Sequence, residues 1–193
     1  MGIHLTDKSL LKSIWEPLIN NLQDKVNKWT FRSLNLGSRL VLIKDVLQSI
    51  PIFLLSTLPA SKGVLQQLRN IQRNFLWGKE ENKKKWVLVS WEKLCKPKDH
   101  EGLSLDDQEI LSKALGAKLW CCWVHNPTTL WANIWKEKYA ISWQTNDLIR
   151  MLGNIKGSHI WNKAWENRRL VQENSLWEIK EGNQALFWED KWQ

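Results

Sequence analysis

Residues 38–50, which read SRLVLIKDVLQSI, decide the fold of the first part of the chain. Their apolar side chains recur every three or four positions, and this spacing places them along one face of a helix. These side chains are Leu40, Ile43, Val46, Leu47 and Ile50. Ser38 stands just before them, where a hydroxyl group can cap the first turn. The stretch therefore predicts an amphipathic helix with one buried face.

The same spacing occurs on both sides of this helix. Residues 7–30 and 61–76 each carry an apolar stripe of helical period. Pro17 interrupts the first stripe and predicts either a kink or the first turn of a second helix. Gly78 ends the second stripe. Three amphipathic helices with short connections bury their stripes most simply as a bundle, so residues 1–78 are predicted to form a helical domain.

The rest of the chain predicts a more irregular arrangement. A basic loop at 79–85 begins a linker over residues 79–105, with a short strand at 86–89 and a helical turn at 91–95. Helices are expected over 106–124, 128–139 and 158–169, the last one capped by Ser158. Alternation in residues 175–188 around Gly182-Asn183 predicts a β-hairpin. Residues 106–193 would thus form a helical domain with a terminal hairpin, and the fold class is mainly α.

Tryptophan is unusually frequent, with 15 residues in a chain of 193. Many fall three or four positions apart, so that both members of a pair share one helix face. These pairs are Trp120/Trp123, Trp131/Trp135, Trp161/Trp165 and Trp188/Trp192. Indole rings fill cores and also stack on nucleic-acid bases. The spacing leaves both uses open, although core packing is the more common one.

The formal net charge of +8 is confined to one half of the chain. Residues 1–100 carry 17 basic and 8 acidic side chains, whereas residues 101–193 carry 11 and 12. This asymmetry favours a polyanionic partner for the first half, and the alternative is a solvated basic face without a specific ligand.

Other classes of protein find no support in the sequence. The three cysteines, Cys95, Cys121 and Cys122, are too few and too badly spaced for a disulfide framework, which indicates a reducing compartment. No zinc-ligand spacing, signal peptide or membrane-length apolar run is present in the sequence. We therefore expect an intracellular protein, nuclear or cytoplasmic, with no membrane association, metal or other cofactor.

Several short motifs occur in a fixed order along nearly the whole chain. They are LNLGSRLVLIKDVL at 34–47, NFLWG at 74–78, VSW and CKPK at 89–98, LW at 130–131, KY at 138–139, and GN with FWEDKW at 182–192. Together they resemble the reverse-transcriptase polyprotein of plant non-LTR (LINE-type) retrotransposons. The resemblance is to the region between the polymerase palm and the zinc-binding and ribonuclease H regions. Cys121-Cys122 departs from it, because the family usually has Trp-Arg there.

The resemblance implies a role without catalysis in this chain. Residues 7–77 correspond to the polymerase thumb, which grips template and primer, and the following residues correspond to a connector. The catalytic carboxylates of the polymerase and of ribonuclease H have no counterparts here. Asp106-Asp107 is the one Asp-Asp pair, and its place before a predicted helix indicates a helix cap. We therefore expect a non-enzymatic fragment.

A thumb needs cations for phosphates, and a connector that binds single strands needs cations beside aromatic rings. The candidate nucleic-acid-binding residues are Lys25, Lys28, Arg32, Arg39, Lys44, Lys83, Lys84, Lys85, Trp77 and Trp86. The expected partners are RNA or an RNA–DNA hybrid and the remaining domains of a parent polyprotein. Two alternatives stay open: a helical protein-interaction module, and a relic gene model without molecular function.

Overall fold

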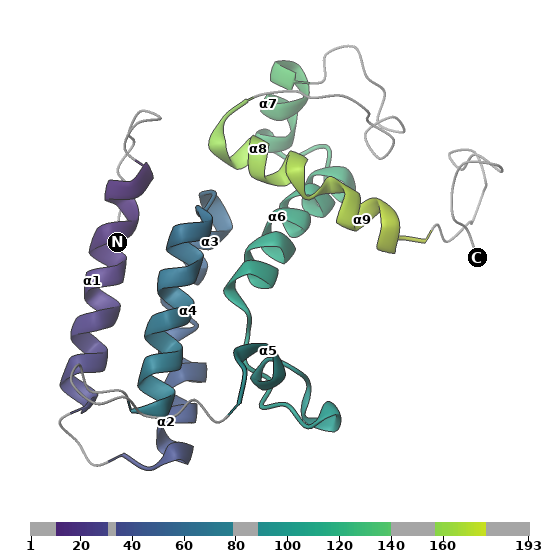
Figure 1. The fold of residues 1–193 in the computed structure, drawn as a ribbon. Helices are drawn as coiled ribbons and strands as arrows, with labels where there is room; N and C mark the ends of the chain where they lie inside the picture. The colour runs from purple at the N-terminus through teal and green to yellow at the C-terminus, as the bar shows by residue number, and fades with distance from the viewer. Residues whose placement is uncertain (1–10, 31–33, 79–88, 140–156, 177–193) are drawn as a thin grey trace. The chain divides into compact units, whose positions relative to one another are not determined.

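The computed structural model describes residues 11–30, 34–78, 89–139 and 157–176. Regular structure in these ranges is helical and includes no β-strand, which confirms the mainly α prediction (Figure 1). The predicted strand at 86–89 and the hairpin at 175–188 lie almost wholly outside the described residues, and both stay predictions. The chain divides into two compact units, Met1–Leu55 with Ala60–Leu111, and Ser56–Pro59 with Ser112–Gln193. The predicted domain borders at 78 and 105 are not tested by this division.

The first unit contains the three predicted helices. Helix α1 (Leu11–Thr30) lies beside α4 (Lys62–Trp77), and α2 (Leu36–Leu42) packs against α4 together with the π-helical turn η2 (Ile43–Leu47) (Figure 1). Pro17 lies inside α1, which continues past it as one helix. A short helix, α3 (Ile52–Thr57), leads toward α4. The buried residues of these helices include Trp15, Leu22, Ile43, Leu47, Leu68 and Phe75.

Helix α2 begins earlier than the sequence suggested. Its N-cap is Asn35, whose Oδ1 accepts a hydrogen bond of 2.8 Å from the backbone N–H of Ser38. The prediction that Ser38 caps this helix is therefore wrong, because the better-placed amide side chain precedes it by three residues. Farther along, the N–H of Gln48 donates to the carbonyl of Ile43, five residues earlier, and so forms the π-helical turn.

Short helical turns precede helix α6 (Gln108–His125) in the first unit. Helix α5 (Trp91–Leu94) and the 3-10 turn η3 (Lys98–His100) are followed by backbone bonds that return the chain to α5. Gly102 is required there, because a side chain at this position would collide with the backbone of Lys96. Helix α6 then begins behind Asp107, whose Oδ1 accepts from the N–H of Glu109 at 2.8 Å. The predicted capping role of this acidic pair is confirmed for Asp107.

The second unit is organised around tryptophan. It combines most of α6 with α7 (Leu130–Tyr139), α8 (His159–Glu166) and α9 (Arg168–Asn174). Ser158 caps α8 as predicted, accepting from the N–H of Trp161. The predicted single helix over 158–169 is interrupted, since Asn167 separates α8 from α9. Its Nδ2 donates to the carbonyl of Lys163 at 2.8 Å, and this side-chain bond accompanies the break.

Candidate nucleic-acid interface

The described part of the first unit contains half of the predicted site residues. Lys25 and Lys28 lie in the last turns of α1, Arg39 in α2, Lys44 in η2, and Trp77 at the end of α4. Lys28 is exposed, and the other four are half-buried. The remaining predicted residues lie outside the described part of the chain, and nothing in the structure bears on them. They are Arg32, Lys83, Lys84, Lys85 and Trp86.

Three helices meet at the C-terminal end of α4. The rings of Trp29 and Phe75 pack with their centroids 5.6 Å apart, which joins the end of α1 to the last turns of α4. The guanidinium of Arg39 joins α2 to Gly78, the residue that closes α4. Lys28, beside Trp29 in the sequence, therefore reaches the same end of the unit as Arg39 and Trp77. Lys25 lies about one turn before Lys28 in α1, and Lys44 lies about one turn after Arg39, in η2.

The contact between Arg39 and Gly78 is close. Gly78 adopts a left-handed conformation (φ 61°, ψ 41°), and its N–H donates to the carbonyls of Asn74 and Phe75. A β-carbon at Gly78 would overlap Nη1 of Arg39. The last turn of α4 contains no basic residue of its own. Arg39 therefore supplies, from another helix, the positive charge that favours a helix C-terminus.

The electrostatics of this end of the unit are mixed. Helices α1 and α4 both end here, and their terminal carbonyls carry partial negative charge. Lys28 lies in the last turn of α1, and Arg39 lies at the end of α4, so each offsets one of these dipoles. Trp77 is half-buried, and its Nε1 is buried without a protein hydrogen-bond partner among the described residues. Lys28 and Arg39 thus both contribute to the electrostatics of the fold itself.

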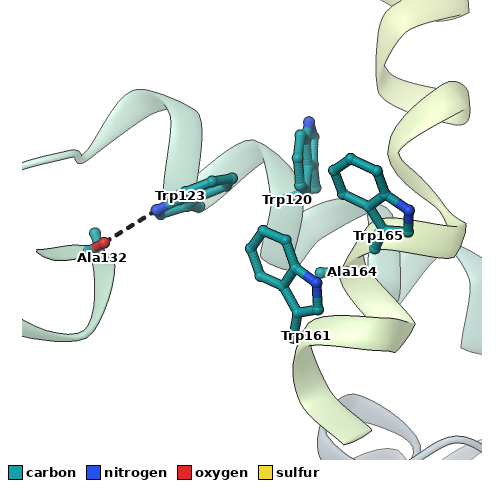
Figure 2. Packing of buried hydrophobic residues seen from close by; sticks show 6 residues of the cluster. All are labelled: Trp120, Trp123, Ala132, Trp161, Ala164 and Trp165. Carbon is teal, nitrogen blue, oxygen red and sulfur yellow. Dashed lines mark hydrogen bonds between the residues drawn. The ribbon is translucent and has the colours of Figure 1, made fainter. Parts of the chain in front are cut away.

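The tryptophan pairs of the second unit form its core. Figure 2 shows Trp120 and Trp123 of α6 facing Trp161 and Trp165 of α8. All four are buried, and neighbouring ring centroids lie 5.0 to 6.1 Å apart. Nε1 of Trp123 donates to the carbonyl of Ala132 at 3.2 Å (Figure 2). These rings cannot stack on bases, and the core interpretation is confirmed for them.

One residue that the sequence did not suggest is Lys163 of α8. It is 3% exposed, and its Nζ donates at 3.2 Å both to the carbonyl of Leu58 and to Oγ of Ser112. Burial lowers the pKa of Lys163 from 10.5 to about 8. No pattern in the sequence predicts this site, because lysine is rarely buried and Leu58 is 105 residues away.

The histidine, cysteine and acidic side chains of the described residues bear on metal and thiol chemistry. Within them, no three His, Cys, Asp or Glu side chains gather to hold a metal ion. The three cysteines are free, and Sγ of Cys121 lies 3.5 Å from Nδ1 of His125. No helix in the described ranges is long and apolar enough to cross a bilayer.

Two proteins of Arabidopsis thaliana are similar to this chain. One, described as a ribonuclease H protein, is 29% identical over 190 residues, which are 96% of this chain and 30% of the relative. The chain thus spans under a third of that protein. The other, an uncharacterized mitochondrial protein, is 28% identical over 145 residues, which are 75% of this chain and 92% of the relative. No protein-family profile and no solved structure matches the chain. The two similarities are consistent with a retrotransposon-related protein.

Proposed function

We propose that the chain is a non-catalytic, retroelement-derived fragment whose first unit binds RNA or an RNA–DNA hybrid through its phosphates. In this proposal the first unit corresponds to the thumb of a LINE-type reverse transcriptase, and the second unit to the connector after it. Its other partners would be the remaining domains of a parent polyprotein. The similarity to a ribonuclease H protein over nearly the whole chain supports an origin in such a polyprotein.

The observation that carries the proposal is the meeting of α1, α2 and α4 at one end of the first unit. That end gathers Lys28 and Arg39, with Lys25 and Lys44 a turn away, on the half of the sequence that holds the whole basic excess. A rigid helical frame with cations on its end suits phosphate contacts that do not read sequence. The buried tryptophans of the second unit give that unit a folded core, which supports a functional fragment over a relic.

The test is a fluorescence-anisotropy titration of the whole chain with labelled RNA–DNA hybrid, single-stranded RNA and duplex DNA at about 50 to 200 mM salt. We expect saturable binding to the RNA-containing ligands that weakens steeply with salt. Lys28→Gln should lower the slope of log K against log salt by about 0.9 if it removes one phosphate contact. A folded chain that binds none of the three ligands would refute the proposal.

One observation favours a protein-interaction module as a second candidate. On α7, Leu130 and Trp131 each lie one turn before Ile134, and the three side chains are 79%, 36% and 53% exposed. Exposed apolar side chains grouped in this way often mark a docking surface. Binding through them would change little with salt, so the same salt series separates the two candidates. Leu130→Ser with Ile134→Ser would abolish apolar docking and leave nucleic-acid binding intact.

A further inference from the structure

The position of Arg39 differs from that of a free phosphate ligand. Its side chain is half-buried, and its guanidinium lies against the left-handed Gly78 that closes α4. At the start of α2, Asn35 fixes the first turn through its bond to the N–H of Ser38, so the helix that carries Arg39 is itself anchored. A planar guanidinium can lie on a glycine, and a β-carbon at this position would require the guanidinium to move.

The contact between Arg39 and Gly78 has a consequence for Trp77. Gly78 is the last described residue before the lysine-rich sequence KEENKKK at 79–85. Gly78 ends α4 in a left-handed conformation, and the guanidinium of Arg39 lies against this residue. Because Trp77 directly precedes Gly78, a change at Arg39 would act on Trp77 through the geometry of the cap.

We infer that Arg39 is a positioning residue of the proposed interface, which locks the end of α4 through Gly78 and does not itself contact phosphate. This inference rests on the proposed nucleic-acid function. It separates Arg39 from Lys28, which is exposed in the last turn of α1 and is available to a phosphate. It also predicts that a change at Gly78, which removes no charge, reproduces the effect of changing Arg39.

The experiment compares four variants of the whole chain in the titration with RNA–DNA hybrid, each first shown by circular dichroism to keep the wild-type helix content. Gly78→Ala fills the space under the guanidinium, Arg39→Lys keeps the charge without the planar group, and Arg39→Gln removes the charge. Lys62→Gln removes an exposed charge at the opposite end of α4 and measures the general effect of charge loss. Binding is followed over the same range of salt concentrations.

We expect Gly78→Ala, Arg39→Lys and Arg39→Gln to weaken binding about five- to tenfold, because each lowers the fraction of molecules with the competent cap. Their salt slopes should equal those of charge-matched controls: wild type for the first two variants and Lys62→Gln for the third. The inference is overturned if folded Gly78→Ala or folded Arg39→Lys binds like wild type, or if Arg39→Gln loses about 0.9 of the slope relative to Lys62→Gln. Absence of binding by the wild-type chain would instead refute the proposed function, and this inference with it.

If Gly78→Ala does not fold, Arg39→Lys carries the test alone. Its charge is unchanged and its side chain is smaller at the contact, so it introduces no overlap with Gly78. A direct phosphate ligand would tolerate this change better than a positioning residue, because lysine also binds phosphate. Normal affinity of Arg39→Lys would therefore overturn the inference.

Discussion

A single carboxylate, that of Asp107, joins two elements of the first unit. Its Oδ2 lies 2.7 Å from Nη2 of Arg69 on α4, while its Oδ1 accepts from the N–H of Glu109 at the start of α6. The same region receives a third tie, since Nε2 of Gln48 donates to the carbonyl of Asp106 at 3.2 Å. Polar contacts thus fasten the start of α6 to α4 and to Gln48, the residue that follows η2.

The two roles of Asp107 can be separated by substitution. Asp107→Asn keeps an oxygen for the cap and removes the ion pair, which should cost about 0.5–1 kcal/mol because the pair is partly exposed. Asp107→Ala removes the cap as well and should cost about 1 kcal/mol more. Urea unfolding measures both free energies. Asp106→Ala is the control and should be nearly neutral, because Gln48 contacts only the backbone of Asp106; equal losses for Asn and Ala would contradict the capping role.

The glycines at the two ends of α4, Gly63 and Gly78, should respond to alanine with stability changes of opposite sign. At Gly78 the left-handed backbone and the Arg39 guanidinium both oppose a β-carbon, so Gly78→Ala should lower the free energy of unfolding by about 1–2 kcal/mol. At Gly63 the nearest atom to an added β-carbon is Oγ of Ser61 at 3.9 Å, and the residue is helical. Gly63→Ala should therefore raise stability by up to about 1 kcal/mol. If Gly78→Ala left the free energy of unfolding in urea unchanged, neither the backbone nor Arg39 would oppose a β-carbon at this position.

Stability should depend on pH through Lys163. Its pKa is about 8 in the folded chain and 10.5 for an ordinary lysine, so between these values the unfolded state binds more protons. The free energy of unfolding should therefore gain a rising contribution from pH 8 to 10.5, and this contribution should be flat below pH 8. Since other groups titrate in the same window, the measurement is the difference between wild type and Lys163→Met in urea unfolding at each pH.

The matched control for this series is Lys118→Met, which removes an exposed lysine from α6 in the same unit. The free energy of unfolding of Lys118→Met should depend on pH as that of the wild type does. If Lys163→Met also showed this dependence, the buried ammonium would not be the source of the effect.

The tryptophans should divide sharply by burial. Trp161 is fully buried between Trp120, Trp123 and Trp165, and Trp161→Ala should cost about 3–5 kcal/mol. Trp131 is 36% exposed, and Trp131→Ala should cost far less, about 1 kcal/mol. Thermal unfolding measures the stability cost of each substitution, and near-ultraviolet circular dichroism reports the packing of the remaining tryptophans. Similar losses from the two substitutions would mean that the aromatic cluster is not the core of the second unit.

Apolar spacing predicted α1 and α4 most directly, because their apolar stripes are long and regular. It could not predict the π-helical turn at Ile43–Leu47, since one extra residue in a turn leaves the apolar stripe nearly unchanged. It also could not choose between Asn35 and Ser38 as the cap of α2, because both are good capping residues. The break at Asn167 was missed because an asparagine side chain can bond to the preceding turn without any change in apolar pattern.

The candidate site was less predictable than the fold. The motif around Arg39 and the motif ending in Gly78 were both recognised, but sequence alone does not show that they touch. Lys163 was missed because its partners, Leu58 and Ser112, come from distant parts of the chain. Which residues touch each other in the folded chain depends on tertiary packing, and the local spacing of side chains in the sequence does not encode it.

The bond between Lys163 and Leu58 has a consequence for synthesis on the ribosome. Leu58 leaves the ribosome 105 residues before Lys163, although both belong to the second unit. The segment Ser56–Pro59 therefore cannot form its contact with Lys163 until a further 105 residues, more than half of the chain, have been translated. At about 5–20 residues per second this wait lasts on the order of 5–20 seconds. Leu58 is buried in the finished protein. During that interval, however, the nascent chain would expose its side chain to chaperones.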